Sequence, residues 1–372
     1  MKYCFLISLL LLCSKSHSQH PEINTLPTGS SAPDFNLPST DDRYYSLSDF
    51  SEYPLLAIIF TCNHCPTAQA YEDRMIRLVE KYRPKGVGFV AISPNDPDAV
   101  SLSELGYSDL GDSMEDMKIR AKEKGYNLPY LFDGKTQSTA IAYGPNATPH
   151  VFLFDQNRIL RYSGRIDDME DPYVQPDTKD LQNAIEALLA GREIVNPATK
   201  TFGCSIKWAW KNEWIVKQRE EWKAEPVSLQ EISLDNVKTL IANNTDKLLL
   251  INLWATWCGP CLMEFPSLVD INRMYRGRNF EFVSITTDKL SQEVKALDKL
   301  KNFEASNRNF IFTGKIYELI EAIDPAWQGA LPYSILVEPG GNVLERIPGI
   351  ITPQMLKKRI VDYLGRYYAD NK

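Results

Sequence analysis

One order of elements occurs twice in this chain, and it constrains the fold more than any other feature. An apolar run leads into two cysteines two residues apart, and a helical pattern follows. The first copy, LLAIIFTCNHCP, contains Cys62 and Cys65, and the second, KLLLINLWATWCGPC, contains Cys258 and Cys261. Behind each helix comes another apolar run, GVGFVAIS or FEFVSITT. Each copy therefore predicts a strand, a helix and a second strand.

Each copy then reaches a proline that opens a sequence of strand, turn, strand and helix. Pro149 lies in TPHVFLFDQNRILRYSG, and Pro332 lies in LPYSILVEPGGNVLERIPG. The chain is thus an internal duplication. Strands that alternate with helices before a final hairpin predict an α/β fold class, with two α/β sandwiches built on central mixed β-sheets.

At 372 residues the chain is long enough for two or three domains. We predict a signal peptide at 1–18, a first domain at 19–200, a linker at 201–226 that contains Cys204, and a second domain at 227–372. The linker is rich in tryptophan and charge and should be partly helical.

The start of the chain has the pattern of a secretory signal: Lys2, an apolar run from Tyr3 to Cys13, and small polar residues after it. The run is shorter than the ~20 residues that span a bilayer, and we expect no transmembrane helix in the mature chain. A lipid anchor on Cys13 is disfavoured because Leu12 stands where such sites have a small residue. We expect an exported protein, in a periplasm or cell envelope where thiols meet oxidants.

The charge balance excludes two classes of partner. The chain has 41 Lys and Arg against 48 Asp and Glu, without a block of like charges. Nothing therefore predicts nucleic-acid binding or a polybasic membrane surface.

The second half resembles exported thiol:disulfide interchange proteins of the TlpA and ResA type, through WATWCGPCLMEFPSL. Pro266 lies where thioredoxins kink the helix, and Glu264 lies where this family has an active-site acid. The first half resembles the thioredoxin-like branch of the AhpC/TSA redoxins, through FTCNHCP, GRIDD and the FGCSIKW segment around Cys204. These resemblances imply two thioredoxin folds, with Pro149 and Pro332 as cis-prolines that lie against the cysteines.

Two departures from these families bear on the chemistry. True peroxiredoxins have a threonine three residues before the peroxidatic cysteine and a proline four residues before that, whereas counting back from Cys65 gives Cys62 and Ile58. In the second half Asn252 replaces the buried aspartate of thioredoxin. Glu264 is therefore the expected proton relay there.

The position of a cysteine at a helix start predicts its reactivity. A free thiol has a pKa near ~8.5, and the unpaired N–H groups and positive dipole end of a helix lower it. We expect Cys62 and Cys258 to be the nucleophiles, and Cys65 and Cys261, one turn further into each helix, to be the resolving thiols. The Gly-Pro pair resembles reducing thioredoxins at roughly −270 mV, whereas His64 resembles strong oxidants at roughly −120 mV, which favours electron flow from the second site toward the first.

Other interpretations of the cysteines remain open. Four thiolates can close a structural zinc site, but zinc pairs usually lie ~12–20 residues apart, so we expect no metal. A structural staple is disfavoured because so small a loop removes little entropy from the unfolded chain. Cys204 is either a buried inert thiol or a third redox cysteine that traps or resolves the CNHC site.

The sequence therefore predicts an exported thiol:disulfide oxidoreductase that exchanges dithiols and disulfides with partner proteins and needs no cofactor. A membrane thiol reductant is the expected electron donor. One alternative is a peroxiredoxin-like peroxidase fused to its own thioredoxin-type reductase. Another is a binding module that holds unfolded chains without turnover.

Overall fold

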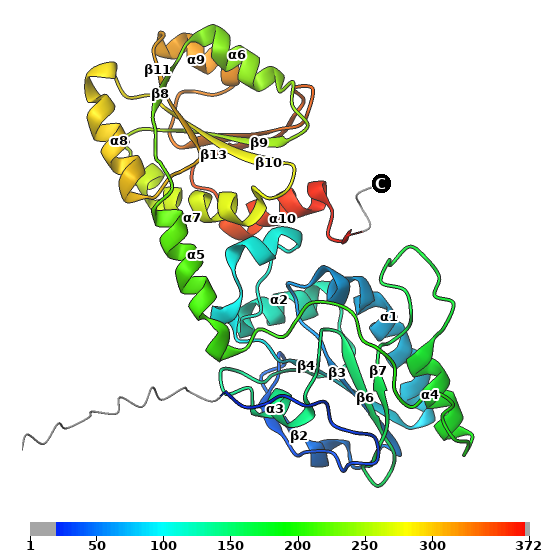
Figure 1. The fold of residues 1–372 in the computed structure, drawn as a ribbon. Helices are drawn as coiled ribbons and strands as arrows, with labels where there is room; N and C mark the ends of the chain where they lie inside the picture. Colours follow the sequence, from blue (N-terminus) through cyan, green and yellow to red (C-terminus); the bar gives the residue numbers. More distant parts are fainter. Residues whose placement is uncertain (1–19, 369–372) are drawn as a thin grey trace, which may run out of the picture.

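The computed structural model describes residues 20–368, and shows two α/β domains joined by a long helix (Figure 1). The predicted signal peptide and Cys13 lie outside these residues. No helix of the described part is long and apolar enough to cross a membrane.

The first domain is built on a five-stranded sheet in the order β5-β4-β3-β6-β7. β3 pairs in parallel with β4 and antiparallel with β6, so the sheet is mixed, as predicted. Its strands are β3 (Leu55–Phe60), β4 (Val87–Ser93), β5 (Tyr130–Phe132), β6 (His150–Phe154) and β7 (Leu160–Gly164), and a separate hairpin consists of β1 (Asn36–Pro38) and β2 (Tyr44–Ser46). The helices are α1 (Pro66–Tyr82), α2 (Met114–Lys124), α3 (Ser138–Tyr143) and α4 (Asp180–Leu189), with 3-10 turns η1 (Leu47–Phe50), η2 (Arg83–Lys85), η3 (Pro97–Ala99) and η4 (Leu102–Tyr107).

The second domain is built on a six-stranded mixed sheet in the order β13-β12-β9-β10-β11-β8. Its strands are β8 (Gln230–Ile232), β9 (Leu248–Trp254), β10 (Phe280–Thr286), β11 (Arg308–Phe312), β12 (Tyr333–Val337) and β13 (Val343–Pro348). The helices are α6 (Leu234–Ala242), α7 (Gly259–Tyr275), α8 (Glu293–Asn302), α9 (Ile316–Ile323) and α10 (Pro353–Leu364), with one 3-10 turn, η6 (Leu290–Gln292). The duplication of two sandwiches is confirmed.

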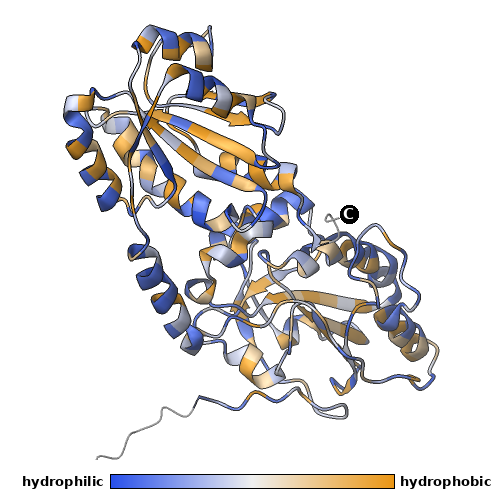
Figure 2. Cartoon of the chain, turned by 45° about the horizontal axis from the view of Figure 1, so that its top comes forward, coloured by the Kyte–Doolittle hydropathy of each residue, from blue (hydrophilic) through white to orange (hydrophobic). Residues whose placement is uncertain are grey.

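The central strands carry each core. Every residue of β3 and of β9 is buried. Figure 2 shows apolar residues concentrated in the strands of both sheets. Apolar clusters fill both faces of each sheet. A strand covered on both faces reads as a continuous apolar run, which is why LLAIIF and LLLINLW lack alternation. Each such strand holds the backbone that leads into its cysteine motif.

The predicted linker splits into two parts. Its first residues lie against the first sheet, where Thr148 and Cys204 form an isolated antiparallel bridge. After a 3-10 turn, η5 (Ala209–Lys211), the helix α5 (Glu213–Lys223) runs toward the second domain. There the guanidinium of Arg273 lies 5.1 Å above the Trp222 ring.

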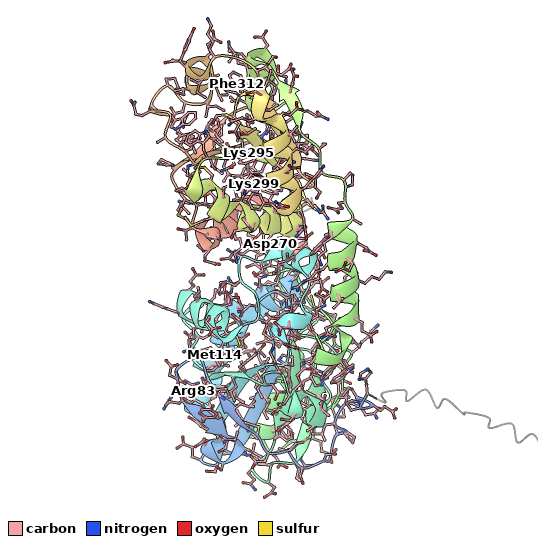
Figure 3. All side chains as sticks on the ribbon, turned by 90° about the vertical axis from the view of Figure 1, so that its left-hand side faces the viewer. Arg83, Met114, Asp270, Lys295, Lys299 and Phe312 are labelled. Atoms are coloured by element: carbon pink, nitrogen blue, oxygen red, sulfur yellow. A yellow bond between two sulfur atoms is a disulfide. The ribbon has the colours of Figure 1, made fainter. Side chains whose placement is uncertain are left out.

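The domains meet where η4 and the loop after it pack against α7 and α10 (Figure 3). Tyr275, at the C-terminal end of α7, donates to the Ser108 carbonyl at 2.8 Å. Asp109 accepts from Gln354 at 3.1 Å and pairs with Arg366. α7 has 17 residues and is thus roughly 25 Å long. The CGPC motif, at its N-terminal end, lies about that distance from the contact between Tyr275 and Ser108.

Candidate redox sites

The CGPC motif lies at the start of α7, as predicted. Cys258 is the N-cap, and its sulfur accepts the backbone N–H of Cys261 at 3.3 Å. Pro260 occupies the first turn, where its missing N–H costs nothing and its fixed φ suits the helix. Cys258 and Cys261 are joined by a disulfide. In the dithiol form, the same N–H and the helix dipole would stabilise a thiolate at Cys258.

This motif forms part of an exposed surface. Trp257 is 66% exposed, and Gly259 and Pro260 are also exposed, while Cys258 itself is 5% exposed. A large protein can therefore approach the first sulfur from the side of the tryptophan. Trp254, in contrast, is fully buried and contacts Phe265 in the core.

Glu264 is a buried acid one turn after Cys261, not a surface residue. Its carboxylate accepts from the Asn252 side chain at 3.0 Å and from the Ile351 N–H at 2.8 Å. Burial raises the pKa of Glu264, and these two hydrogen bonds oppose the rise only in part. A buried carboxyl group with a raised pKa, one helical turn after a CxxC motif, suits proton transfer. Asn252 thus serves to orient Glu264.

The helix after the CNHC motif begins three residues later, relative to the first cysteine, than the helix after the CGPC motif. Cys65, not Cys62, is the N-cap of α1, and its sulfur accepts the Ala68 N–H at 3.4 Å. The prediction that Cys65 lies one turn inside the helix is therefore wrong. The reason is Pro66, which takes the first helical position because it lacks an N–H. Its position directly after Cys65 was the signal in the sequence.

The pKa values of the two thiols follow this register, and they favour roles opposite to the predicted ones. Burial would raise the pKa of Cys65, but hydrogen bonds from the Cys204 and Cys62 thiols outweigh it. The positive charge of His64 and the Ala68 N–H act in the same direction, and hold the pKa of Cys65 well below its usual range. Burial, the hydrogen bond to Cys65 and the charge of Asp112 raise the pKa of Cys62. These pKa directions favour Cys65 over Cys62 as the thiolate of this site. In its thiol form Cys65 donates to the Thr148 carbonyl at 3.5 Å.

His64 is part of a buried hydrogen-bond cluster around Asp112. Its Nδ1 lies 2.6 Å from one carboxylate oxygen, which also accepts from Asn95 at 2.7 Å. The other oxygen accepts the backbone N–H groups of Asn63 and His64 at 2.9 and 3.1 Å. Burial lowers the pKa of His64, but the charge and hydrogen bond of Asp112 outweigh it and raise the pKa. The imidazole Nε2 is buried without a hydrogen-bond partner.

Thr148 and Cys204 complete this site. The Cys62 sulfur lies 3.1 Å from the Thr148 hydroxyl, and the Cys65 sulfur accepts the Cys204 N–H at 3.3 Å. Pro149 and Pro332 both follow cis peptide bonds, so this part of the prediction is confirmed. Pro332 directly precedes β12, which pairs with β9 just before the CGPC motif. Sequence reasoning missed Asp112 and Thr148.

Comparisons with known proteins match the two halves of the chain separately. The model of the AhpC/TSA family matches residues 28–163, and that of the Redoxin family matches residues 220–360. The chain therefore contains two redoxin-type domains in tandem. The predicted pair of redoxin-type domains and the thioredoxin-like α/β fold class are thereby confirmed.

Curated relatives of the tandem redoxin match part of its length. Thiol-disulfide oxidoreductase ResA of Bacillus cereus is 25% identical over 141 residues, which are 38% of this chain and 78% of ResA. ResA of Bacillus anthracis is 26% identical over the same shares.

Solved structures also resemble the tandem redoxin in part. An uncharacterized conserved protein from Geobacillus kaustophilus is 38% identical with a TM-score of 0.45, covering 50% of this chain and 94% of that one. A hypothetical protein from Sinorhizobium meliloti 1021 is 32% identical with a TM-score of 0.44, covering 51% and 98%.

The two motifs of the tandem redoxin do not form the four-thiolate zinc site that was considered. One pair is a disulfide at the far end of α7, and the other lies inside the first domain. Among the described residues, Cys62, His64 and Asp112 have ligand atoms within 4.8 Å of one another. The Asp112 carboxylate already accepts four hydrogen bonds, so we assign this group to hydrogen bonding.

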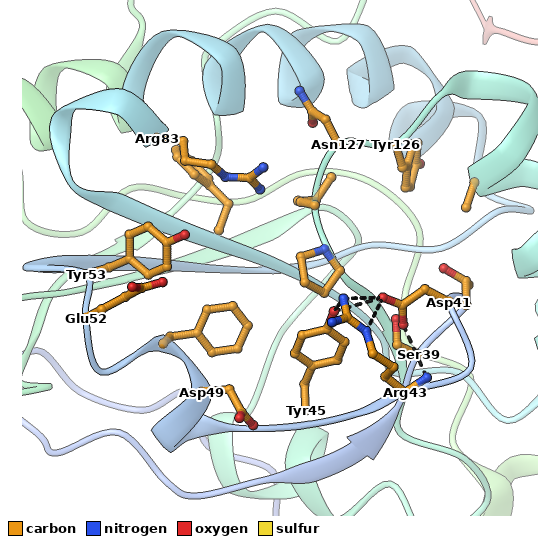
Figure 4. A pocket seen from close by; sticks show the side chains of 16 residues that line it. Ser39, Asp41, Arg43, Tyr45, Asp49, Glu52, Tyr53, Arg83, Tyr126 and Asn127 are labelled. Carbon is orange, nitrogen blue, oxygen red and sulfur yellow. Dashed lines mark hydrogen bonds and ion pairs between the residues drawn. The ribbon is translucent and has the colours of Figure 1, made fainter.

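A polar pocket of the tandem redoxin lies apart from both motifs. It has a volume of about 510 Å³ between the β1–β2 hairpin, the start of η2 and the chain before β5 (Figure 4). Arg43, Asp41 and Tyr45 hydrogen-bond to one another inside it. Its lining contains no cysteine or histidine. We therefore assign it no part in thiol chemistry.

Proposed function

We propose that the tandem redoxin is an exported enzyme that exchanges dithiols and disulfides with partner proteins through two CxxC sites. Its ResA relatives are likewise named thiol-disulfide oxidoreductases. The observation that carries the proposal is the placement of Cys258 at the N-terminus of α7, beside the exposed ring of Trp257.

The steps at this site follow from its geometry. The Cys258 thiolate attacks a disulfide of the partner, forming a mixed disulfide and releasing one partner thiolate. Cys261 gives up its proton toward Glu264 and attacks the Cys258 sulfur. The partner leaves as a dithiol, and Cys258–Cys261 is oxidised. A second dithiol must then reduce the enzyme, and we propose a membrane thiol reductant in the cell envelope as that donor.

The simplest test is the reduction of insulin by dithiothreitol, followed by turbidity. The wild-type chain should accelerate the reaction at least tenfold over the background, and Cys258→Ser should abolish the acceleration. Cys65→Ser is the matched control and should retain at least half the rate. A wild-type chain no faster than dithiothreitol alone would contradict the proposal and leave the binding module as the better account.

Export and partners need a separate experiment in cells. The full chain carrying Cys261→Ser should accumulate mixed disulfides that dithiothreitol dissolves, and peptide mapping should find them on Cys258. The mature protein should be recovered from the periplasmic fraction without residues 1–18. Retention in the cytoplasm with an intact N-terminus would contradict the export proposal.

One observation favours the peroxidase as a second candidate. Cys65 is a fully buried cysteine at a helix start, and its pKa is held below the usual range. A thiol enclosed in this way favours a small oxidant such as hydrogen peroxide over a large protein partner. Stopped-flow oxidation separates the two functions. A peroxidase would oxidise Cys65 orders of magnitude faster than a free thiol, and a rate equal to that of a free thiol would exclude it.

A further inference from the structure

Cys65 lies between two other thiols. Cys62 and Cys65 belong to one buried cluster, and Cys204 packs against that cluster. The backbone N–H of Cys204 points at the Cys65 sulfur from 3.3 Å. Either neighbour is therefore placed to exchange a sulfur–sulfur bond with the central cysteine.

The segment around Cys204 is held in place by its backbone. Thr148 donates its N–H to the Cys204 carbonyl at 3.0 Å. Gly203 has a φ of +130°, and a Cβ at this position would lie 2.1 Å from the Thr148 carbonyl oxygen. Only glycine allows so close an approach with that φ. The chain thus delivers Cys204 to a fixed position beside Cys65, far from the CxxC in sequence.

The three thiols differ in access. Cys62 is 2% exposed and Cys65 is fully buried, whereas Cys204 is partly exposed. Tyr368, from the end of the second domain, contacts the Cys204 side chain and is itself 52% exposed. A protein thiol that approaches the first domain therefore reaches Cys204 before it reaches either cysteine of the CNHC motif.

We propose that Cys204 is a relay cysteine, which forms a disulfide with Cys65 and connects the buried CNHC site to protein dithiols at the surface. The proposal rests on the proposed function, because it gives the first site a route to protein partners.

The relay consists of three thiol–disulfide exchange steps, and electrons and protons balance over the three. In the oxidised site, the Cys204 thiol opens the Cys62–Cys65 disulfide by attack on Cys65, and its proton goes to Cys62 as that sulfur leaves. A partner thiolate then attacks the Cys204 sulfur and Cys65 leaves as a thiolate. The second partner thiol attacks the mixed disulfide, and Cys204 leaves and regains a proton. The partner dithiol becomes a disulfide, and the CNHC disulfide becomes a dithiol.

The first experiment maps the disulfide. Full-length chains carry Cys258→Ser and Cys261→Ser, so that only the first site reacts, and are oxidised with one equivalent of oxidised glutathione. Adding Cys62→Ser should give a Cys65–Cys204 disulfide in peptide mapping. Adding Cys65→Ser is the matched control, and should leave Cys62 and Cys204 unpaired. Glutathione on Cys65 or Cys204 without an internal disulfide in the Cys62→Ser chain would overturn the relay.

The second experiment keeps both CNHC cysteines and measures reduction of their disulfide in the same background. Cys204→Ser should slow reduction by thioredoxin, a protein dithiol, at least tenfold, and should change reduction by dithiothreitol less than twofold. Equal rates with thioredoxin in both chains, or no reduction of the parent chain by thioredoxin, would overturn the relay. The insulin assay depends on Cys258, so failure of the relay would leave that result unchanged.

Discussion

The two CxxC motifs follow the same kind of buried strand but meet their helices at different residues. In the second domain the first cysteine, Cys258, caps the helix, whereas in the first domain the second cysteine, Cys65, does so. Every residue from Thr61 to Pro66 is buried, while Trp257, Gly259 and Pro260 are exposed. One domain thus presents its first sulfur to large partners, and the other encloses its reactive sulfur.

The difference teaches that the position of one proline goes with which cysteine caps the helix. A proline inside the motif, Pro260, lets the helix begin just after the first cysteine. A proline after the motif, Pro66, delays the helix start until after the second. The same spacing of cysteines therefore supports two directions of attack, and neither the CxxC pattern nor the strand before it distinguishes them.

The largest expected effect is the difference between Cys258 and Cys65 in their accessibility to a bulky thiol reagent. We predict that a polyethylene-glycol maleimide modifies Cys258 of the reduced native chain at least ~100-fold faster than Cys65, because reaching Cys65 requires a local opening that costs about 3 kcal/mol or more. Mass spectrometry of peptides from timed samples measures both rates. The unfolded chain is the control, since both thiols should react there at similar rates. Similar rates in the folded chain would remove the contrast between the sites.

Two glycines give a matched comparison of backbone constraint. Gly203→Ala should cost about 1–3 kcal/mol in the unfolding free energy of the first domain, because its Cβ would strike the Thr148 carbonyl. Gly259→Ala should change stability by less than ~0.5 kcal/mol, since nothing lies within 4 Å of its added Cβ. Denaturant unfolding measures both. A neutral Gly203→Ala would show that the Cys204 segment is not held as described.

The substitution Asp112→Asn tests whether Asp112 lowers the pKa of Cys65 through His64. The charge of Asp112 raises the pKa of His64, and the charge of His64 lowers that of Cys65. Without the carboxylate His64 should lose its proton at lower pH, and Cys65 should ionise at higher pH. Alkylation of Cys65 by iodoacetamide at pH 6 should fall several-fold, while Cys258 serves as the internal reference. An unchanged pH profile for Cys65 would contradict this coupling.

The smallest effect is expected from Glu264→Gln. The pKa of Glu264 is raised by burial, so stability from its neutral form is present at low pH and is lost as pH rises through the folded-state pKa. The Glu264→Gln variant should not show this loss of folding stability with rising pH. It should also slow insulin reduction by less than about tenfold and remove the rise of rate with pH that ionised Glu264 produces. A rate profile identical to wild type would exclude the carboxylate as the proton acceptor of Cys261.

Much of the fold was predictable because apolar runs and cysteine motifs report on local structure. The two mixed sheets follow from apolar runs whose partners are close in sequence or paired across a strand. The cis peptide bonds before Pro149 and Pro332 were expected only from the resemblance to thioredoxin folds. Asp112 was not predictable, because it reaches His64 from a loop 48 residues away that has no repeating pattern. The bridge between Thr148 and Cys204 likewise depends on how a predicted linker folds back.

The contact of Tyr368 with Cys204 joins the state of the domain junction to the chemistry of the first site. Tyr368 also packs its ring 5.0 Å from that of Tyr107 in the first domain, beside the ion pair of Asp109 and Arg366. Separation of the two domains would remove Tyr368 from Cys204 and increase the solvent exposure of the Cys204 sulfur. A force, a salt or a binding partner that separates the two domains would thereby change the rate of thiol–disulfide exchange at the CNHC site. No cysteine would have to be altered directly.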